Sequence, residues 1–562
     1  MPTTLAPTRF LSVTRNRAAV VFLAVLAVMV GFALSPPAAR AEANSTTLTI
    51  VGTSDVSDSG LSNVLDADFT SFYDKAHPGV HISVNYKGEG TQAAINDAEA
   101  GNGSALLVHA ESLENQFVAD GFSLEQYGRA VFHGDFVLLG PTSDPAQVDP
   151  TDAHNVVGAF QDIATAGASS EANFISRSDN SGTNVEEHEI WALTNVTKCT
   201  VSTANGGGST PATTTGDCPQ TAPAWYQPTN DHSQATNVEF TNTCNGLPGG
   251  TNTCYTITDR GTYDNLEAQG LIPNLKVVTQ SAPGDTLLVN SFHAYAINPA
   301  AVPSTANLNP ILALAFVQWL SSPAGQTASN NYLKDAPGGS PFLEDAAPVI
   351  TASKLPSTKQ GGKSVTVKGS VTNVVPGTPR LIGKKVTLSA LRTSVAKADP
   401  DAKPVALKSV LTNRQGQYSF TFTPNANAKY TVSTAEISQI ENDTTLHPPF
   451  GDLLSPASKS LGRMNVRAAV SIHKVKASKG VVTITGGLNP TATGAFAHLS
   501  LYAGHSGHSL KFVGKRDARA DKHSFVLHFH LVRGFTWRLR LKYVTAGQTL
   551  TGTSAARSVT VH

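Results

Sequence analysis

The stretch that decides the fold of the larger part of this chain is FISRSDNSGTNVEEHEIWAL, residues 174–193. It opens with a short apolar run typical of a buried strand, and from residue 185 to residue 193 it follows helical spacing. The loop between them is polar and contains Arg177, whose guanidinium can hold an oxyanion through two parallel hydrogen bonds. The alternative is a surface ion pair between Arg177 and the nearby Asp179, which would contribute little.

Three small residues follow Arg177 at the expected start of the helix. Ser181 and Thr183 carry hydroxyl donors, and Gly182 leaves its backbone amide open to a ligand. The N-terminus of a helix attracts anions because its first amides lack partners within the helix. The loop therefore predicts an anion site.

Two further junctions have the same strand–loop–helix form. Thr53 and Ser54 follow a β-branched strand and precede a helix, and Gly90 and Thr91 occupy a similar position after residue 86. We expect all four to contact the same ligand. The alternatives are an ordinary cluster of helix caps at the first junction and a plain tight turn at the second.

Strand-like and helix-like segments alternate from Glu42 to about Leu343. The alternation predicts an α/β fold with largely parallel sheets. Residues 198–254 interrupt the pattern with Gly-Gly-Gly, Thr-Thr-Thr and cysteines, which indicates an insertion. A structureless loop of this length is uncommon inside a domain unless it is tied down or functional.

The insertion is bounded by cysteines, and all four in the chain lie close together at Cys199, Cys218, Cys244 and Cys254. An even, clustered set in an exported chain predicts two local disulfides, and the spacing fits no zinc pattern. Pairing each cysteine with its neighbour in sequence is the simplest expectation, although the sequence does not fix it.

The N-terminus predicts export to the outside of the cytoplasmic membrane. Residues 1–41 show a basic start, an apolar run over 18–34 and a small-residue cleavage site before Glu42, as in a signal peptide. The apolar run is long enough that an uncleaved anchor is the alternative. No cysteine lies near the site, so we expect no lipoprotein attachment.

The remainder of the 562 residues predicts two all-β domains of immunoglobulin-like type. We expect a linker at 346–363, a sandwich at 364–445, a second linker at 446–464 and a last sandwich at 465–562. The chain has no net charge, but from Arg463 onward it holds 15 Lys and Arg against two Asp. This basic end could attract an anionic cell-wall polymer, or it is a solvated surface.

The Arg-Ser-Asp-x-Ser-Gly-Thr segment at 177–183 resembles the anion-binding segment of the phosphate-binding and tungstate-binding proteins of ABC importers. The chain is most similar to the tungstate-binding family. The similar stretches occur in family order over about 250 residues: DSGL at 58–61, LLVHA at 106–110, FVADG at 117–121, DFVLLGP at 135–141, TITDRGTY at 256–263 and AINP at 296–299.

This resemblance implies a type II periplasmic-binding-protein fold over 42–345, with a ligand between two α/β lobes. Lobe 1 would span about 42–130 and 285–345, and lobe 2 about 131–284. The resemblance places anion contacts on Ser54, Thr91, Arg177, Ser181 and Thr183. It implies tungstate or molybdate as the ligand, an ABC permease as the partner, a monomer, and neither enzyme activity nor a cofactor.

Two departures bear on the ligand. Asp55 interrupts the run of Thr and Ser that the family has in its first loop. A carboxylate repels a fully ionised dianion and favours one that keeps a proton, such as hydrogen phosphate. Against phosphate, the family's phosphate-binding members place an Asp where this chain has His109.

Two other functions compete with import. A cell-surface interaction protein would use the basic β-domains, which an importer subunit does not need. A hydrolase is disfavoured because the chain has neither a Gly-x-Ser-x-Gly elbow nor a His-Glu-x-x-His helix. No nucleic-acid-binding or metal-binding motif is present in the sequence.

Overall fold

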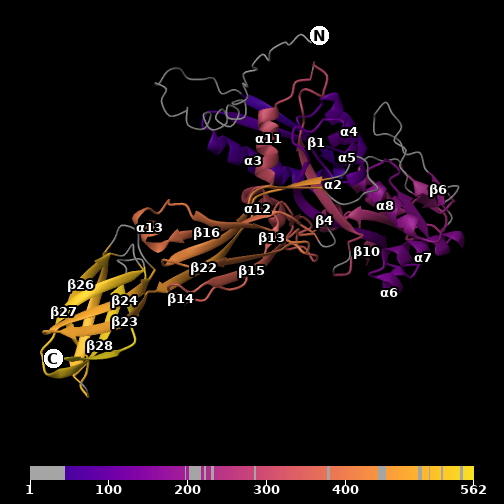
Figure 1. Ribbon diagram of the computed structural model, residues 1–562. Coiled ribbons are helices and arrows are strands. Elements are labelled where there is room, and N and C mark those ends of the chain that lie inside the picture. Colours follow the sequence, from indigo (N-terminus) through magenta and orange to yellow (C-terminus); the bar gives the residue numbers. More distant parts are fainter. Residues whose placement is uncertain are drawn as a thin grey trace, which may run out of the picture.

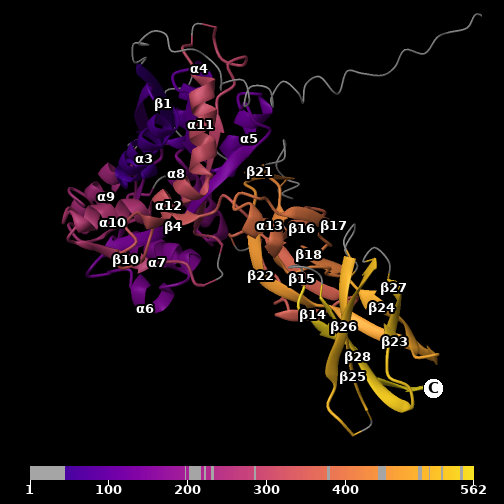
Figure 2. The same ribbon diagram turned by 90° about the vertical axis from the view of Figure 1, so that its left-hand side faces the viewer.

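The computed structural model shows an α/β unit of two lobes followed by two β-sandwiches (Figure 1). The sandwiches follow one another away from the α/β unit toward the C-terminus (Figure 2). No helix in the part of the chain that the structure describes is long and apolar enough to cross a membrane. That part comprises residues 45–196, 198–200, 217–219, 223–229, 233–283, 286–304, 306–375, 380–440, 451–490, 496–505, 507–519, 523–544 and 549–562. The predicted signal peptide lies outside it.

Lobe 1 is built on a sheet with the strand order β2-β1-β3-β11-β4, in which β1, β2 and β3 are parallel. Helix α3 buries Leu61, Leu65 and Phe69, which recur every four residues, in the core of this lobe. Phe72, in the last turn but one of the same helix, is 47% exposed. The strands are β1 (Ser45–Thr53), β2 (His81–Glu89), β3 (Ala105–Val108), β4 (Gly128–Pro141), β11 (Val289–Ala296) and β12 (Leu343–Glu344). The helices are α2 (Ser54–Asp58), α3 (Leu61–Ala76), α4 (Thr91–Ala100), α5 (Glu111–Ala119), α11 (Pro310–Leu320) and α12 (Pro323–Asn331).

Lobe 2 extends the sheet in the order β4-β9-β5-β8, with β10 on the other side of β4. Its core packs the rings of Phe160, Phe174 and Trp191 at steep angles, with the ring centroids of Phe160 and Trp191 4.6 Å apart. The strands are β5 (Asn173–Ser176), β6 (Lys198–Thr200), β7 (Asp217–Pro219), β8 (Tyr226–Pro228), β9 (Cys254–Asp259) and β10 (Leu275–Thr279). The helices are α6 (Val148–Asp152), α7 (Val156–Ala168), α8 (Gly182–Leu193), α9 (Gln234–Thr243) and α10 (Arg260–Ala268).

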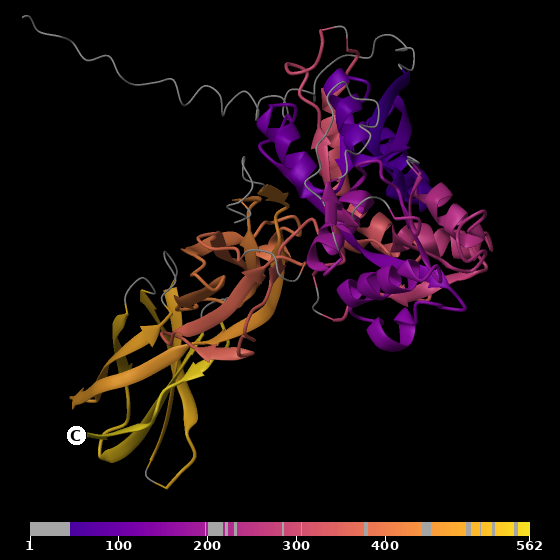
Figure 3. The same ribbon diagram turned by 90° about the vertical axis from the view of Figure 1, so that its right-hand side faces the viewer.

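Strand β4 runs through both lobes, which Figure 3 shows from the opposite side. Its residues 129–135 pair with β11 in lobe 1, and its residues 136–139 pair with β9 in lobe 2. The chain returns beside the same point, where the Phe136 amide donates to the Leu288 carbonyl over 2.8 Å. The predicted two-lobed α/β fold is therefore confirmed, and the first crossing falls near residue 135 rather than at 131.

Each sandwich encloses its own apolar core between two sheets. The middle one consists of β13 (Val349–Ile350), β15 (Val365–Thr372) and β18 (Gln417–Phe422) facing β14 (Thr358–Gln360), β22 (Ser458–Arg467), β19 (Ala428–Thr434), β16 (Lys385–Arg392) and β17 (Val405–Leu411), with helix α13 (Thr393–Ala398). The last one consists of β23 (Ala469–Ser478), β24 (Val481–Asn489) and β27 (Ser524–His530) facing β26 (Lys511–Arg519), β25 (Phe496–His505), β28 (Phe535–Val544), β29 (Gly552–Thr553) and β30 (Arg557–Val561).

The two segments expected as linkers contain strands, which corrects the sequence analysis. Residues 349–350 and 358–360 form β13 and β14. Residues 458–467 form β22 of the middle sandwich, although the sequence predicts 458–464 as linker and 465–467 as the start of the last sandwich. The sequence does not predict β22, because this strand is mostly polar and buries only Met464 and Val466 on its inner side.

A hairpin from the middle sandwich joins the sheet of lobe 1. Strands β20 (Ile437–Ile440) and β21 (Gly451–Leu454) pair antiparallel, and β21 adds in parallel to β4 at residues 128 and 129. Next to this contact, His293 of β11 lies buried between two carboxylates, one of which belongs to β21. Its Nδ1 is 3.0 Å from Glu114 Oε2 and its Nε2 is 3.1 Å from Asp452 Oδ1. Burial alone would lower the pKa of His293, but these two carboxylates raise it well above its usual value.

We expect the hairpin contact to make the folded chain less stable as the pH rises from 6.5 to 8.5. Burial, with Asp452 nearby, raises the pKa of Asp345 to about 8 from an ordinary 3.8, so its deprotonation opposes folding across this range. Protonated His293 contributes to the free energy of unfolding. This contribution is fully present below pH 6.5 and is lost as the pH rises through the raised pKa of His293. Urea unfolding at several pH values measures the slope, and Asp345→Asn should flatten it. An unchanged slope in that variant would contradict the assignment.

Candidate functional site

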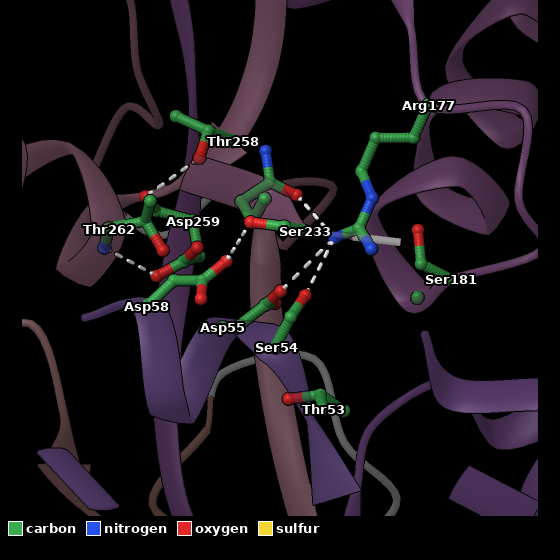
Figure 4. A network of polar contacts seen from close by, with 12 residues as sticks. Thr53, Ser54, Asp55, Asp58, Arg177, Ser181, Ser233, Thr258, Asp259 and Thr262 are labelled. Atoms are coloured by element: carbon green, nitrogen blue, oxygen red, sulfur yellow. Dashed lines mark hydrogen bonds and ion pairs between the residues drawn. The ribbon is translucent and has the colours of Figure 1, made fainter. Parts of the chain in front are cut away.

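The ends of strands from both lobes meet at one place (Figure 4). In lobe 1, β1, β2 and β3 are parallel, so the residues that follow them, Ser54, Thr91 and His109, lie along one edge of the sheet. In lobe 2, Arg177 directly follows β5. Ligands of open α/β sheets bind at the carboxyl ends of the strands, which is the edge that both lobes present here.

Arg177 is the centre of this cluster and is 2% exposed. Its Nη1 donates to Ser54 Oγ over 3.0 Å and to Gln234 Oε1 over 2.8 Å. Its Nε and Nη2 donate to Asp179 Oδ2 over 3.1 and 2.7 Å. The Ser54 contact crosses from lobe 2 to lobe 1, so the guanidinium bridges the two lobes.

Asp55 faces the same guanidinium from lobe 1. Its Oδ1 is 3.7 Å from Arg177 Nη1, and its Oδ2 is 2.9 Å from His109 Nε2. Burial would raise the pKa of Asp55, but His109 and Arg177 outweigh burial and lower it. For Arg177, burial is outweighed by Asp179 and Asp55, and its pKa is raised. The cluster therefore holds a permanent guanidinium beside an ionised carboxylate.

The start of α8 completes the cluster. Ser181 caps the helix by accepting from the Asn184 amide over 3.3 Å, and the Gly182 amide donates to Thr91 Oγ1 of lobe 1 over 3.1 Å. A side chain on Gly182 would strike the His109 ring, with Cε1 only 2.1 Å from an added Cβ. Glycine is therefore required at this position for the lobes to approach this closely.

The loop before α8 is held in an unusual backbone form. Ser178 and Asn180 have φ angles of 50° and 58°, and Ala110, beyond His109, has 96°. Non-glycine residues rarely adopt such angles unless their surroundings impose them, and they gather at functional sites. Asp179 stabilises the loop because its Oδ1 accepts from the Ser181 amide over 3.0 Å.

All eight residues predicted to bind ligand are buried near the junction of the lobes. Ser54 and Arg177 touch, as do Thr91 and Gly182, while Gly90 lies against Asp179 and Ser181. The hydroxyls of the remaining two, Thr53 and Thr183, are buried and have no hydrogen-bond partner among the residues that the structure describes. The alternative pair of Arg177 with Asp179 does form, but in the buried cluster and not on the surface.

Sequence reasoning missed Gln234, which comes from the predicted insertion and begins α9. It also missed a second contact between the lobes. Asp58 of lobe 1 accepts from Ser233 Oγ over 3.0 Å and from the Ala235 amide over 2.9 Å, at the N-terminus of α9. Burial raises the pKa of Asp58 above its ordinary value. No local pattern signals either contact, because the two residues of each contact are far apart in the sequence.

A hollow of about 440 Å³ opens between the lobes beside this cluster. It is lined from lobe 1 by His109, Glu111 and Asn290, and from lobe 2 by Gly182 and Glu186. His109 therefore separates the open hollow from the Arg177 cluster. The described residues contain no group of His, Cys, Asp and Glu able to hold a metal ion.

The cysteines bracket the segment that carries Gln234. Cys244 and Cys254 form a disulfide, with Cα atoms 5.7 Å apart, between the end of α9 and the start of β9. Strands β6 and β7 place residues 199 and 218 opposite each other. The side chains of Cys199 and Cys218 lie outside the described residues, so their pairing stays a prediction.

Two hinged α/β lobes whose strand ends meet around buried polar groups define a solute-binding protein. The sequence profile of the PBP superfamily domain matches residues 37–324, and the chain belongs to this superfamily. It is 30% identical over 289 residues, 51% of this chain and 68% of the relative, to a Haloferax volcanii protein with the provisional name ABC transporter anion-binding protein. It is 29% identical over 298 residues, 52% of this chain and 84% of the relative, to the tungstate-binding protein TupA of Peptoclostridium acidaminophilum. A solved structure of TupA from Desulfovibrio alaskensis G20 is 27% identical, with 53% of this chain and 99% of that chain covered and a TM-score of 0.36.

Proposed function

We propose that this protein captures a tetrahedral oxyanion outside the cytoplasm and delivers it to the permease of an ABC importer. One observation carries the proposal: the buried guanidinium of Arg177 reaches from lobe 2 to Ser54 of lobe 1, 3.0 Å away. A cation at the junction of two lobes can bind an anion and can also stabilise the state in which the lobes are closed. Relatives named for anion binding and tungstate binding support this function, and tungstate or molybdate is the favoured ligand.

The site binds by exchanging partners and needs no covalent chemistry. In the closed arrangement Arg177 donates to Asp179, Gln234 and Ser54. An oxyanion would take the place of Ser54 as an acceptor on the Nη1 side, where the Asp55 carboxylate lies 3.7 Å away, while Asp179 keeps the guanidinium oriented. The free hydroxyls of Thr53 and Thr183 would add donors without charge. Donors that are oriented before the ligand arrives lose little entropy on binding.

Isothermal titration of the full exported chain with tungstate, molybdate, phosphate and sulfate tests the proposal. A bound anion should also raise the unfolding temperature, because a ligand that binds only the folded state stabilises it by mass action. The favoured ligands should give the tightest binding. Absence of heat and of stabilisation with all four anions would contradict oxyanion capture.

Hydrogen phosphate is a second candidate, and Asp55 favours it. This carboxylate is 1% exposed, lies 3.7 Å from Arg177 Nη1 and is held ionised by a lowered pKa. An ionised carboxylate can accept the proton that hydrogen phosphate carries, but tungstate, molybdate and sulfate have no proton to offer near neutral pH.

Replacing Asp55 with alanine should separate the two ligands. If tungstate is the ligand, removing the repelling carboxylate should tighten tungstate binding by about tenfold. If hydrogen phosphate is the ligand, the loss of its acceptor should weaken phosphate binding by about tenfold or more. Titration of both anions into the variant measures this, and Asp264→Asn, which removes a carboxylate of lobe 2 on α10, is the control. An Asp55→Ala variant with unchanged affinity for both anions would show that this side chain does not face the ligand.

A further inference from the structure

The outer face of the larger sheet in the last sandwich gathers basic and aromatic side chains. On β25, Leu499 and Leu501 point into the core and are fully buried, so Ser500 and Tyr502 point outward. The register then fixes which neighbours share that face. We call it the basic face, and it comprises Tyr502, Phe512, Lys515, Arg538, Arg540 and Lys542.

The positive charges of the basic face have no acidic partners within the described residues. The ion pair found in this sandwich joins His498 to Asp517, at the edge of the face. Lys515, Arg538 and Lys542 are exposed and form no ion pair in the described part of the chain. A surface with several like charges and no compensation attracts a partner of opposite sign, and its field is felt over roughly 8–10 Å at physiological salt.

Aromatic rings lie among these charges. Phe512 is 54% exposed, and its ring centroid is 5.7 Å from that of Tyr502. Lys542 Nζ sits 4.5 Å above the Tyr502 ring. The edge contact with Tyr502 leaves about half of the Phe512 surface exposed to solvent, where it is available to a ligand. A flat ring beside cations suits a ligand that has both apolar faces and negative charges.

A hollow of about 740 Å³ lies on the same sheet, and two of the basic residues of this face line it. It is lined by Lys515 and Lys542 together with the polar side chains of His498, Ser500, Asp517 and Thr551. The hollow therefore offers cations for negative groups and both donors and acceptors for hydroxyl groups.

We propose that the basic face binds a linear anionic glycan, a polymer of sugar units that carry carboxylate or phosphate groups at intervals. The cations meet the charged groups, Phe512 and Tyr502 pack against sugar rings, and Ser500, Asp517 and Thr551 meet hydroxyls. The acceptor Asp517 in the hollow disfavours a ligand that presents only phosphates. Lys515 and Lys542 line a hollow, and cations set in a hollow suit a polymer segment better than the surface of a bilayer.

Binding of the full chain to defined polymers tests this proposal. The probes are polygalacturonate as the anionic glycan, dextran as an uncharged glycan, inorganic polyphosphate as a polyanion without sugars, and phosphatidylglycerol vesicles. The test variant combines Lys515→Gln, Arg540→Gln and Lys542→Gln. The control combines Lys474→Gln, Lys476→Gln and Lys479→Gln, which remove the same charge from exposed positions on or next to β23 in the opposite sheet.

We expect polygalacturonate to bind at low salt, with a loss of at least about tenfold in the test variant and little change in the control. Phe512→Ala should weaken polygalacturonate but leave polyphosphate unchanged, since only the glycan has rings to pack on it. No binding at low salt, equal losses in both triple variants, or binding to vesicles or polyphosphate in preference to the glycan would overturn the proposal. Thermal unfolding of each variant shows that the fold is kept, and oxyanion titration of the same samples reports the cleft independently.

Discussion

Arg177→Ala is expected to abolish most of the oxyanion affinity, with a loss of at least about 30-fold, or about 2 kcal/mol. The guanidinium is the permanent cation that contacts Ser54 across the junction, and a buried anion without a countercharge is strongly disfavoured. Titration with the best-bound of the four anions measures the loss.

The same substitution should also destabilise the fold, because it leaves Asp179 buried without its cationic partner and Asp55 with His109 alone. Breaking a buried pair in this way typically costs about 3–5 kcal/mol. Arg129→Ala is the matched control. Arg129 is 5% exposed and pairs with Glu125 of lobe 1 and with Glu436 of the middle sandwich, neither of which lines the cleft. It should lower stability and leave anion affinity within about twofold. Equal loss of affinity in both variants would mean that Arg177 acts only by holding the fold.

Asp452→Ala is expected to release the β20–β21 hairpin from lobe 1. The substitution leaves protonated His293 with one carboxylate where it had two, and buried charges that lose a partner cost about 3–5 kcal/mol. Amide hydrogen exchange in β21 should accelerate, and urea should detach the middle sandwich at a lower concentration than in the parent chain.

Glu436→Ala provides the comparison for this second prediction. Glu436 also joins the hairpin region to lobe 1, 3.0 Å from Arg129 Nη1, but its side chain is 46% exposed. An exposed pair contributes up to about 1 kcal/mol, so this variant should exchange almost as slowly as the parent. Hydrogen exchange that responds equally to both substitutions would show that His293 does not secure the hairpin.

The features that could be predicted from sequence are those with a local pattern. The Arg177 loop, the Ser54 junction and the Thr91 junction each combine a strand end with small polar residues, and parallel strands place such ends along one edge. Their convergence follows from the topology once the α/β pattern is seen. The resemblance to a known family supplied the lobes and the choice of ligand.

The features that could not be predicted join segments far apart in the chain. Gln234 lies in a stretch that looks like an insertion, and Asp58 meets α9 only because the lobes close. The same holds for β21, of which Asp452 and Leu453 pair with β4 about 320 positions earlier. A parallel pairing over such a separation leaves no periodicity in either segment, so the region around it reads as a linker.

The attachment of β21 decides which half of the molecule can move. Among the described residues, β21 pairs with β4 only at residues 128 and 129, before the crossing into lobe 2. The sandwiches are therefore attached to lobe 1 through the middle one, and we expect lobe 2 to be the part that moves about the crossing near residue 135. If the basic face binds a polymer, lobe 1 would stay in place together with the sandwiches, at a constant distance from that polymer. Lobe 2 would then be the lobe that moves to open and close the anion site.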